Sequence, residues 1–410
     1  MTLRHCLYLL IIPVLAASLP LPALEDEALC NNREILAAQK KYEAARQRPA
    51  QASALPEPTI SLGYSSSGAP YPVAGIGVVP TANAGVTISQ EMPFPGKQKL
   101  RGEVAAKEAD AEFQQYLSVR LSVVSRLKQT YHELHHANTA IAFTRRDQEL
   151  LESILRISEA RYAAGRAPQQ DIFKAQTQFS IFEAQLLRYQ QEQTSKEIEI
   201  DALLNRPPGG HIDIPEEMAA GVMPATLDEL LAHARDAPAL AGSRQTIERA
   251  ELAADLARKD YYPDYTLSGG YFNQGAMPPM WQFRVDFKLP AYFWRSQRAA
   301  VNEREFSAAE ARHAYEAAGV EAQARIREQY SAATTSLRLA DLYDKSVLPE
   351  ARLALESSLT GYQTGTVDFV TVFSNFMNVV DNELLYHEEI MQYYVALARL
   401  EELAGMEFQP

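Results

Sequence analysis

The sequence has little cysteine and no excess of positive charge, and each shortage excludes a class of protein. Only 2 of the 410 residues are cysteine, and removal of an N-terminal signal would leave Cys30 alone, so no intrachain disulfide is expected. The net charge of −13 argues against nucleic-acid binding, which requires a basic surface. After the N-terminus, no run of residues approaches the roughly 18–20 apolar residues of a membrane-spanning helix.

The N-terminus, residues 1–23, is predicted to be a secretory signal peptide. Arg4 and His5 precede an apolar run at residues 7–17, and small residues follow it. The run is too short to span a bilayer and has the flanks of a cleaved signal. Three prolines argue against the alternative of a buried core helix: Pro13, Pro20 and Pro22.

The remaining chain contains the same series of segments twice. The sequences Tyr162-Ala163-Ala164-Gly165 and Tyr362-Gln363-Thr364-Gly365 stand 200 positions apart. Each follows a pair of extended segments and a long helical run. We therefore predict two structural repeats, residues 24–206 and 227–410, each starting with a helix. A Pro/Gly-rich connector at 207–226 joins them.

Two β-hairpins are predicted, at residues 57–92 and 264–290. In the second, alternating apolar residues predict a strand with one apolar and one polar face; they are Trp281, Phe283, Val285, Phe287 and Leu289. Four strands cannot close a membrane barrel, which needs about eight, and lipid does not tolerate open strand edges. Other subunits must therefore complete such a barrel. Two copies would supply eight strands, and three would supply twelve around a water-filled pore.

A long helical hairpin is predicted in each repeat, at residues 97–205 and 295–404. Between Lys97 and Tyr162 apolar residues recur at helical spacing without a proline, which predicts a helix about 100 Å long. Only Pro349 interrupts the second long helix. A further helix is predicted over residues 27–54. Helices this long need neighbours along their whole length.

The segment that leads from the second strand into the first long helix carries a family resemblance. Gln90-Glu91-Met92-Pro93-Phe94-Pro95-Gly96-Lys97-Gln98-Lys99-Leu100-Arg101 is similar to the heavy-metal (CzcC/CusC-like) branch of the TolC-like outer-membrane efflux proteins. The ending Leu400-Glu401-Glu402-Leu403-Ala404-Gly405 resembles the same branch, and the similarity extends from about residue 27 to residue 406.

The resemblance implies a mostly α fold with a small β part. Three subunits would form a helical barrel across the periplasm, and their β-hairpins would form a shared 12-stranded transmembrane barrel in the outer membrane of a Gram-negative bacterium. The implied partners of this homotrimer are outer-membrane lipid, a periplasmic adaptor (membrane fusion) protein and an inner-membrane RND-type pump. No cofactor, no metal centre and no catalysis are implied.

The resemblance also places the candidate functional residues at the hairpin tips, near 162–168 and 362–368. The implied adaptor-docking residues are Tyr162, Gly165, Arg166, Tyr362, Gly365 and Thr366. Glycine at a tip allows a reversal with positive φ and close approach of another backbone, although a plain helix C-cap is the alternative. Related channels often close with aspartates one and two turns after the second glycine, where this chain has Thr371 and Ser374. The nearest acidic residues, Asp171 and Asp368, complete the candidates for the periplasmic aperture.

One motif points to different chemistry. His132-Glu133-Leu134-His135-His136 matches the zinc-protease pattern, in which two histidines on one helix face bind the metal and the glutamate acts as a base. The motif lies inside an uninterrupted helix, and no third-ligand motif follows. A solvent-exposed helix face is therefore expected, with weak surface binding of a metal ion by His132 and His136 as one alternative and a zinc metalloprotease as a remote one.

The remaining polar groups predict no further chemistry. The pairs Glu388-Glu389 and Glu401-Glu402 are expected to be exposed helix charges, and Met277 and Met280 to be incidental loop residues. The favoured function is a passive exit duct, with heavy-metal cations as the expected solutes. Drug efflux and type I protein secretion stay open as alternatives, as does a coiled-coil structural protein without a pore.

Overall fold

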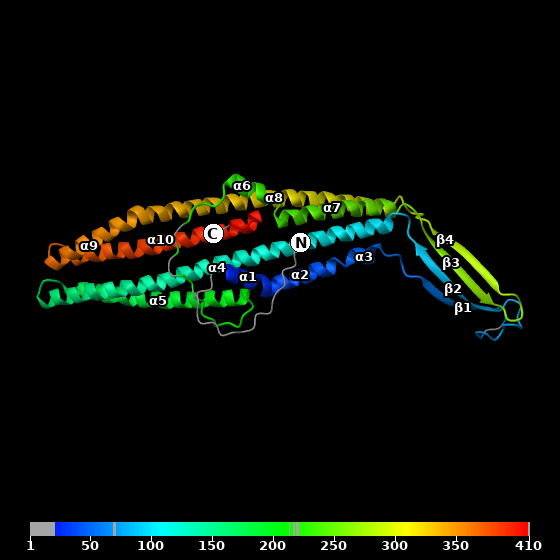
Figure 1. Cartoon of the computed structure of the whole chain (residues 1–410), viewed down its shortest axis with the longest axis horizontal. Coiled ribbons are helices and arrows are strands. Elements are labelled where there is room, and N and C mark those ends of the chain that lie inside the picture. Colours follow the sequence, from blue (N-terminus) through cyan, green and yellow to red (C-terminus); the bar gives the residue numbers. More distant parts are fainter. Residues whose placement is uncertain (1–20, 69–70, 213, 216–217, 219–220, 409–410) are drawn as a thin grey trace. The chain divides into compact units, whose positions relative to one another are not determined.

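The computed structural model describes residues 21–68, 71–212, 214–215, 218 and 221–408. Residues 1–20 of the predicted signal peptide lie outside this part of the chain. The described residues are mostly helical, with long helices and one four-stranded antiparallel sheet (Figure 1), which confirms the predicted fold class. They form two compact units. The helical unit comprises the residues up to Ala38, Tyr116–Pro238 and those from Gly319 onward, and the sheet unit comprises Gln39–Gln115 and Ala239–Ala318.

The sheet has the strand order of a simple meander. It runs β1-β2-β3-β4 with every neighbouring pair antiparallel. The strands are β1 (Thr59–Ser65), β2 (Asn83–Met92), β3 (Asp264–Asn273) and β4 (Met280–Lys288). The two hairpins, one from each repeat, therefore join into one sheet, with β2 and β3 in the middle and β1 and β4 at the edges (Figure 1).

The strand register separates an apolar from a polar face. Tyr271 of β3 lies between Val86 of β2 and Trp281 of β4. Three residues further along each strand, Ser89 pairs with Ser268, which in turn pairs with Arg284. Because side chains alternate along a strand, the aromatic and aliphatic residues gather on one face and the hydroxyl and charged residues on the other. The apolar face is open, and Phe283 on it is 83% exposed.

The helices of both repeats include some of unusual length. α4 (Lys97–Ala163) has 67 residues and is therefore about 100 Å long. None of the helices in the described part of the chain is long and apolar enough to cross a lipid bilayer. The other elements are α1 (Leu21–Asn31), α2 (Arg33–Ala45), α3 (Arg48–Ser53), α5 (Gln169–Leu203), α6 (Leu227–Ala234), α7 (Pro238–Lys259), α8 (Ser296–Leu342), the π-helical turn η1 (Tyr343–Val347), α9 (Leu348–Thr364) and α10 (Phe369–Ala404).

The single helix predicted over residues 27–54 is wrong, because the structure has three short helices there. The Asn32 side-chain oxygen accepts a hydrogen bond from the Glu34 amide at 2.8 Å and so caps the start of α2. Its amide nitrogen donates to the Leu203 carbonyl of α5 at 2.8 Å. The second break precedes α3, which has Pro49 in its first turn, where a missing amide hydrogen is tolerated.

The interruption expected at Pro349 takes the form of a π-helical turn. η1 directly precedes α9, and Pro349 occupies the first turn of α9. Proline cannot donate the amide hydrogen bond of a regular helix. The wider turn instead brings the Leu348 amide to the Tyr343 carbonyl, so α8 and α9 continue without a loop between them.

Candidate functional site

Both helical hairpins reverse direction through the same backbone motif. Gly165 has φ 69° and Gly365 has φ 87°, values that favour glycine. The Arg166 amide donates to the Arg161 carbonyl at 2.8 Å, and the Thr366 amide donates to the Gly361 carbonyl at 2.9 Å. Together with hydrogen bonds from each glycine amide to the tyrosine carbonyl three residues earlier, these contacts form a Schellman cap. Helix capping is thus the structural role of both glycines.

The two tip tyrosines lie in different surroundings. Tyr162 is 45% exposed, whereas Tyr362 is 1% exposed. The Tyr362 hydroxyl donates to the Ser158 hydroxyl of α4 at 3.1 Å. The Arg161 guanidinium lies 4.5 Å from the centre of the Tyr362 ring and donates to the Tyr362 carbonyl. The tip of the second hairpin is therefore held by α4 of the first, and the Tyr362 ring belongs to the core.

The acidic aperture candidates lie near one another but differ in burial. Asp171 is 5% exposed, and this burial raises the pKa of its carboxyl group. Lys174 lowers the Asp171 pKa and the negative charge of Asp368 raises it. Asp368 caps α10 by accepting a hydrogen bond from the Thr371 amide at 2.9 Å, and the side chain and the amide of Thr371 both lower the Asp368 pKa. Thr371 and Ser374 are exposed on the first turns of α10.

The zinc-protease pattern lies in the interior of the helical unit, and its predicted solvent exposure is wrong. His132 is 6% exposed, and its ring stacks on Tyr394 with centres 4.5 Å apart. Burial, His135 and Lys128 lower the pKa of His132 to about 3. α10 covers this face of α4. The two histidines four positions apart, which suggested a metal site, therefore belong to the packing between these helices.

The other members of the pattern also have structural contacts. The Glu133 carboxylate forms an ion pair with Lys196 of α5 at 2.6 Å. This pairing gives Glu133 a structural contact in place of the general-base role that the pattern suggests. Burial lowers the pKa of His136. In the described ranges, no group of three histidine, cysteine, aspartate or glutamate side chains is arranged to hold a metal ion.

A buried carboxylate that sequence reasoning missed joins three helices. Glu383 of α10 is 2% exposed and accepts hydrogen bonds from Arg352 of α9 at 2.6 and 3.1 Å. Arg146 of α4 donates to the other Glu383 oxygen and also to Asp147 at 3.0 Å. The signal in the sequence is a single acidic residue within the apolar stripe of the last helix, but its partners are 31 and 237 positions away.

The carboxylate pair at the end of α10 differs from its prediction. Glu401 was expected to be exposed, yet it is 8% exposed. It pairs with Lys128 of α4 at 2.6 Å and accepts the Phe408 amide at 2.8 Å. These contacts fasten the C-terminal tail to α4, which explains the burial. Glu388 is exposed, and Glu389 is half-buried.

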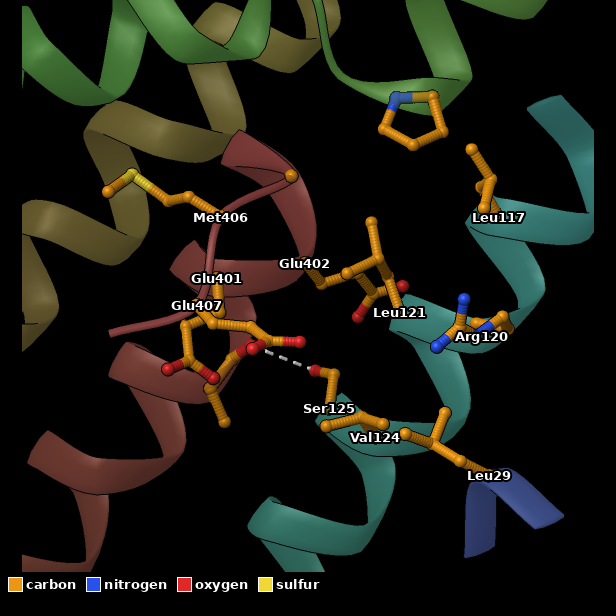
Figure 2. Close-up of a pocket in the computed structure, with 13 residues that line it drawn as sticks. Leu29, Leu117, Arg120, Leu121, Val124, Ser125, Glu401, Glu402, Met406 and Glu407 are labelled. Atoms are coloured by element: carbon orange, nitrogen blue, oxygen red, sulfur yellow. Dashed lines mark hydrogen bonds between the residues drawn. The ribbon is translucent and has the colours of Figure 1, made fainter. Parts of the chain in front are cut away.

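A cavity of about 210 Å³ lies beside this C-terminal segment. Figure 2 shows Leu117, Leu121 and Val124 of α4 facing it opposite the end of α10. Ser125 donates to the Ala398 carbonyl at 3.0 Å across the two helices. The remaining wall carries carboxylates: Glu401, Glu402 and Glu407. No tip residue lines this cavity, and it brings no nucleophile and base together.

Gly361, one turn before the second tip, is expected to be required for the close packing of that tip. A Cβ atom at Gly361 would lie 2.5 Å from the Val367 side chain, so Gly361→Ala should destabilise the helical unit by about 1–3 kcal/mol. Gly319→Ala is the matched control, because nothing lies within 4 Å of its added Cβ and alanine is the better helix former. Thermal unfolding of both variants in detergent measures the difference. Equal melting temperatures would contradict the tip packing.

The family of the chain follows from comparison with known proteins. The model of the family described as outer membrane efflux protein matches residues 24–206 and 228–406. The chain belongs to the outer membrane efflux protein family. The two matched segments indicate an internal duplication. As a member of this family the protein is an efflux channel of the outer membrane and periplasm that acts in tripartite systems, and it is not an enzyme.

Solved structures of other channels share the fold of this efflux protein. CusC superposes with a TM-score of 0.80 at 17% identity, over 94% of this chain and 92% of CusC. VceC from Vibrio cholerae gives 0.81 at 18% identity, over 95% and 97%. The open state of MtrE from Neisseria gonorrhoeae gives 0.77 at 18% identity, over 95% and 89%. A search of curated proteins found no match. The three channels are about equally distant in sequence, so the shared fold does not select a substrate.

Proposed function

We propose that this efflux protein is the passive, trimeric outer-membrane duct of a tripartite system that exports heavy-metal cations. The observation that carries a barrel shared between subunits is the sheet, which has an open apolar face, a polar face and two edge strands without partners in the described part of the chain. Lipid requires every backbone group to be paired. Three four-stranded sheets satisfy this requirement as a 12-stranded barrel whose polar faces line the pore.

The position of the tips supports a role in opening the duct. α4 begins five residues after the end of β2 and ends at the first tip, so one continuous helix of 67 residues connects the strand to the tip in the chain. A docking site for an adaptor protein at the tips fits this arrangement. The exposed side chains Tyr162, Arg166 and Thr366 would make that contact, while Tyr362 sets the shape of the tip from within.

Heavy-metal cations are proposed because of the segment at Gln90–Arg101, which resembles the metal branch of the family. The excess of 52 acidic over 39 basic residues suits a conduit for cations. Drug efflux and type I secretion use ducts of the same construction, so substrate choice needs its own experiment. Deletion of the gene should increase sensitivity to copper, zinc or cobalt salts and leave sensitivity to organic drugs unchanged. The reverse pattern would refute the metal assignment.

Single-channel recording tests whether the protein forms a pore. The full-length protein in a planar lipid bilayer should give discrete conductance steps, because a 12-stranded barrel encloses a water-filled lumen. A structural coiled-coil protein would give none. Boiled protein, in which the barrel is unfolded, is the control for detergent leaks.

Locking neighbouring tips together should stop export. Arg166→Cys and Thr366→Cys, combined in a Cys30→Ala background, place thiols at the exposed turns. Cross-linking of adjacent subunits in the periplasm is expected to abolish export, because the tips must separate when the adaptor docks, and a reductant should restore it. Unchanged export by fully cross-linked protein would show that the tips do not move.

A further inference from the structure

Phe272 is an exception to the division of the sheet into an apolar and a polar face. Residues that pair across the four strands form rows, and the members of a row lie on the same face. The row of Phe272 also contains Gly63, Gly85 and Met280. Because side chains alternate along a strand, this row belongs to the polar face, as does the row of Ser89. Among the described strand residues, Phe272 carries the only aromatic ring on that face.

The Phe272 ring lies over two glycines. A Cβ atom at Gly85 would be 2.4 Å from the Cδ1 atom of the ring, and a Cβ atom at Gly270 would be 2.8 Å from its Cε2 atom. Carbon atoms that are not bonded to each other prefer a separation of about 3.5–4.0 Å. The ring therefore occupies the space that side chains at both positions would fill. It is half-buried, because it lies back along the sheet and does not project from it.

The two glycines differ in what an added side chain would meet. At Gly270 the nearest atoms belong to side chains, namely the Phe272 ring and the Thr87 hydroxyl oxygen at 2.9 Å. At Gly85 the nearest atom is the Tyr271 carbonyl oxygen at 2.3 Å. A side chain can rotate away, whereas a backbone carbonyl moves only with its strand. A methyl group at Gly270 should therefore lift the ring from the sheet, while one at Gly85 would disturb the pairing of β2 with β3.

The surroundings of the Phe272 ring on the polar face are uncharged. Neither its own row nor the next row on this face carries a charged side chain; the next row is Ser61, Thr87, Gly270 and Gln282. The charged residues of the strands on this face lie further from the β3–β4 turn; they are Glu91, Asp264, Arg284, Asp286 and Lys288. A solute beside these two rows would meet no fixed charge, so steric contact would decide how it passes.

We propose that Phe272 determines the size limit of the barrel near the β3–β4 turn, and that Gly270 keeps this limit high by letting the ring lie along the wall. Three subunits place three such rings around the lumen. The limit acts on the size of a solute and not on its charge. This inference rests on the proposed function, because the polar face lines a lumen only when several subunits close the barrel.

The labelling rate of a thiol placed beyond the Phe272 row tests this inference. Thr59→Cys, in a Cys30→Ala background, places the thiol at an exposed position on the polar face, two rows of that face further from the β3–β4 turn. Maleimides coupled to poly(ethylene glycol) of increasing length, added outside intact cells, must pass the Phe272 row to reach this thiol. Because the reagent enters through the barrel, the rate does not depend on whether the tips are open.

Gly270→Ala should slow labelling, and the longest reagents should lose the most, because the displaced rings narrow the lumen. Gly270→Ala/Phe272→Ala should restore the native rates, since no ring is left to displace. Gly63→Ala is the matched control, because Gly63 lies in the Phe272 row and nothing lies within 4 Å of its added Cβ. This control should label at the native rates.

Phe272→Ala alone should admit longer reagents than the native protein does. It adds no atom to the sheet, so it decides the question even where Gly270→Ala does not fold. Native rates in both single variants, or slow labelling of Gly270→Ala that Phe272→Ala does not relieve, would overturn the inference. Conductance of the same proteins separates the two proposals: conducting channels with unchanged labelling refute the role of Phe272 alone, and folded protein without conductance refutes the duct.

Discussion

Replacing Glu383 with alanine is expected to lower the free energy of unfolding by about 1.5–3 kcal/mol, the range for hydrogen bonds to a charged group, because the two arginines left behind are half-exposed and can be hydrated. The Glu383 side chain is 3% exposed, while those of Arg146 and Arg352 are 47 and 57% exposed. The substitution removes the only carboxylate among the described residues that joins α9 and α10 to Arg146 of α4. Two arginines are left facing each other without their shared anion, which adds repulsion to the lost hydrogen bonds.

Chemical denaturation of the detergent-solubilised protein measures this loss. Glu383→Gln keeps the shape and part of the hydrogen bonding and should fall between the native protein and the alanine variant. Glu388→Ala, an exposed carboxylate on the same helix, is the matched control with an expected change below about 0.5 kcal/mol. Equal effects of Glu383→Ala and Glu388→Ala would mean that the three-helix junction does not stabilise the fold.

Acidification is expected to destabilise the protein through buried histidines. The pKa of His132 is lowered to about 3, and that of His387 to about 4, from 6.5 in the unfolded chain. Below pH 6.5 the unfolded chain therefore binds more protons than the folded chain, so stability is present above pH 6.5 and falls as the pH drops. At pH 5 the loss from His132 amounts to about 2 kcal/mol.

The variant His132→Phe isolates this effect. Phenylalanine retains a ring to stack on Tyr394 and removes the proton-binding nitrogen, so melting temperatures measured from pH 7.5 to pH 5 should show a shallower decline. The groups around His132 are His135, Lys128 and the rings of Tyr131 and Tyr394, and none of these is changed. His313→Gln alters an exposed histidine and should keep the native pH dependence. A decline equally steep in His132→Phe would contradict the assignment.

The sequence predicted the elements whose pattern is local and repeated. Alternation in β4 and helical periodicity along α4 identified a strand and a helix, because each face of these elements has a constant environment. The breaks at Asn32 and before α3 were missed, since capping by a side chain and proline in a first turn override a continuous helical pattern. Pro349 marked the right place, but the π-helical turn that accommodates it has no signal of its own.

The candidate site was predictable only where the two repeats agree. Gly165 and Gly365 were found because they occupy equivalent positions in the two repeats, and the structure shows that both cap their helices. The repeats differ at the equivalent positions Arg161 and Gly361, and Arg161 of the first hairpin covers Tyr362 of the second. Likewise, burial of His132 and pairing of Glu383 depend on α10 packing against α4. Such contacts between distant segments leave no pattern in a single sequence.

Cross-linking of the two edge strands tests most directly whether three chains share one barrel. In a Cys30→Ala background, Ser61→Cys on β1 is combined in turn with Gln282→Cys, Arg284→Cys or Asp286→Cys on β4, all on the polar face. If β1 of one protomer pairs with β4 of its partner, at least one combination forms disulfides that give covalent dimers and trimers on denaturing gels, with no species above the trimer. Monomers alone in every combination, obtained from protein that conducts in bilayers, would contradict a barrel shared among three subunits.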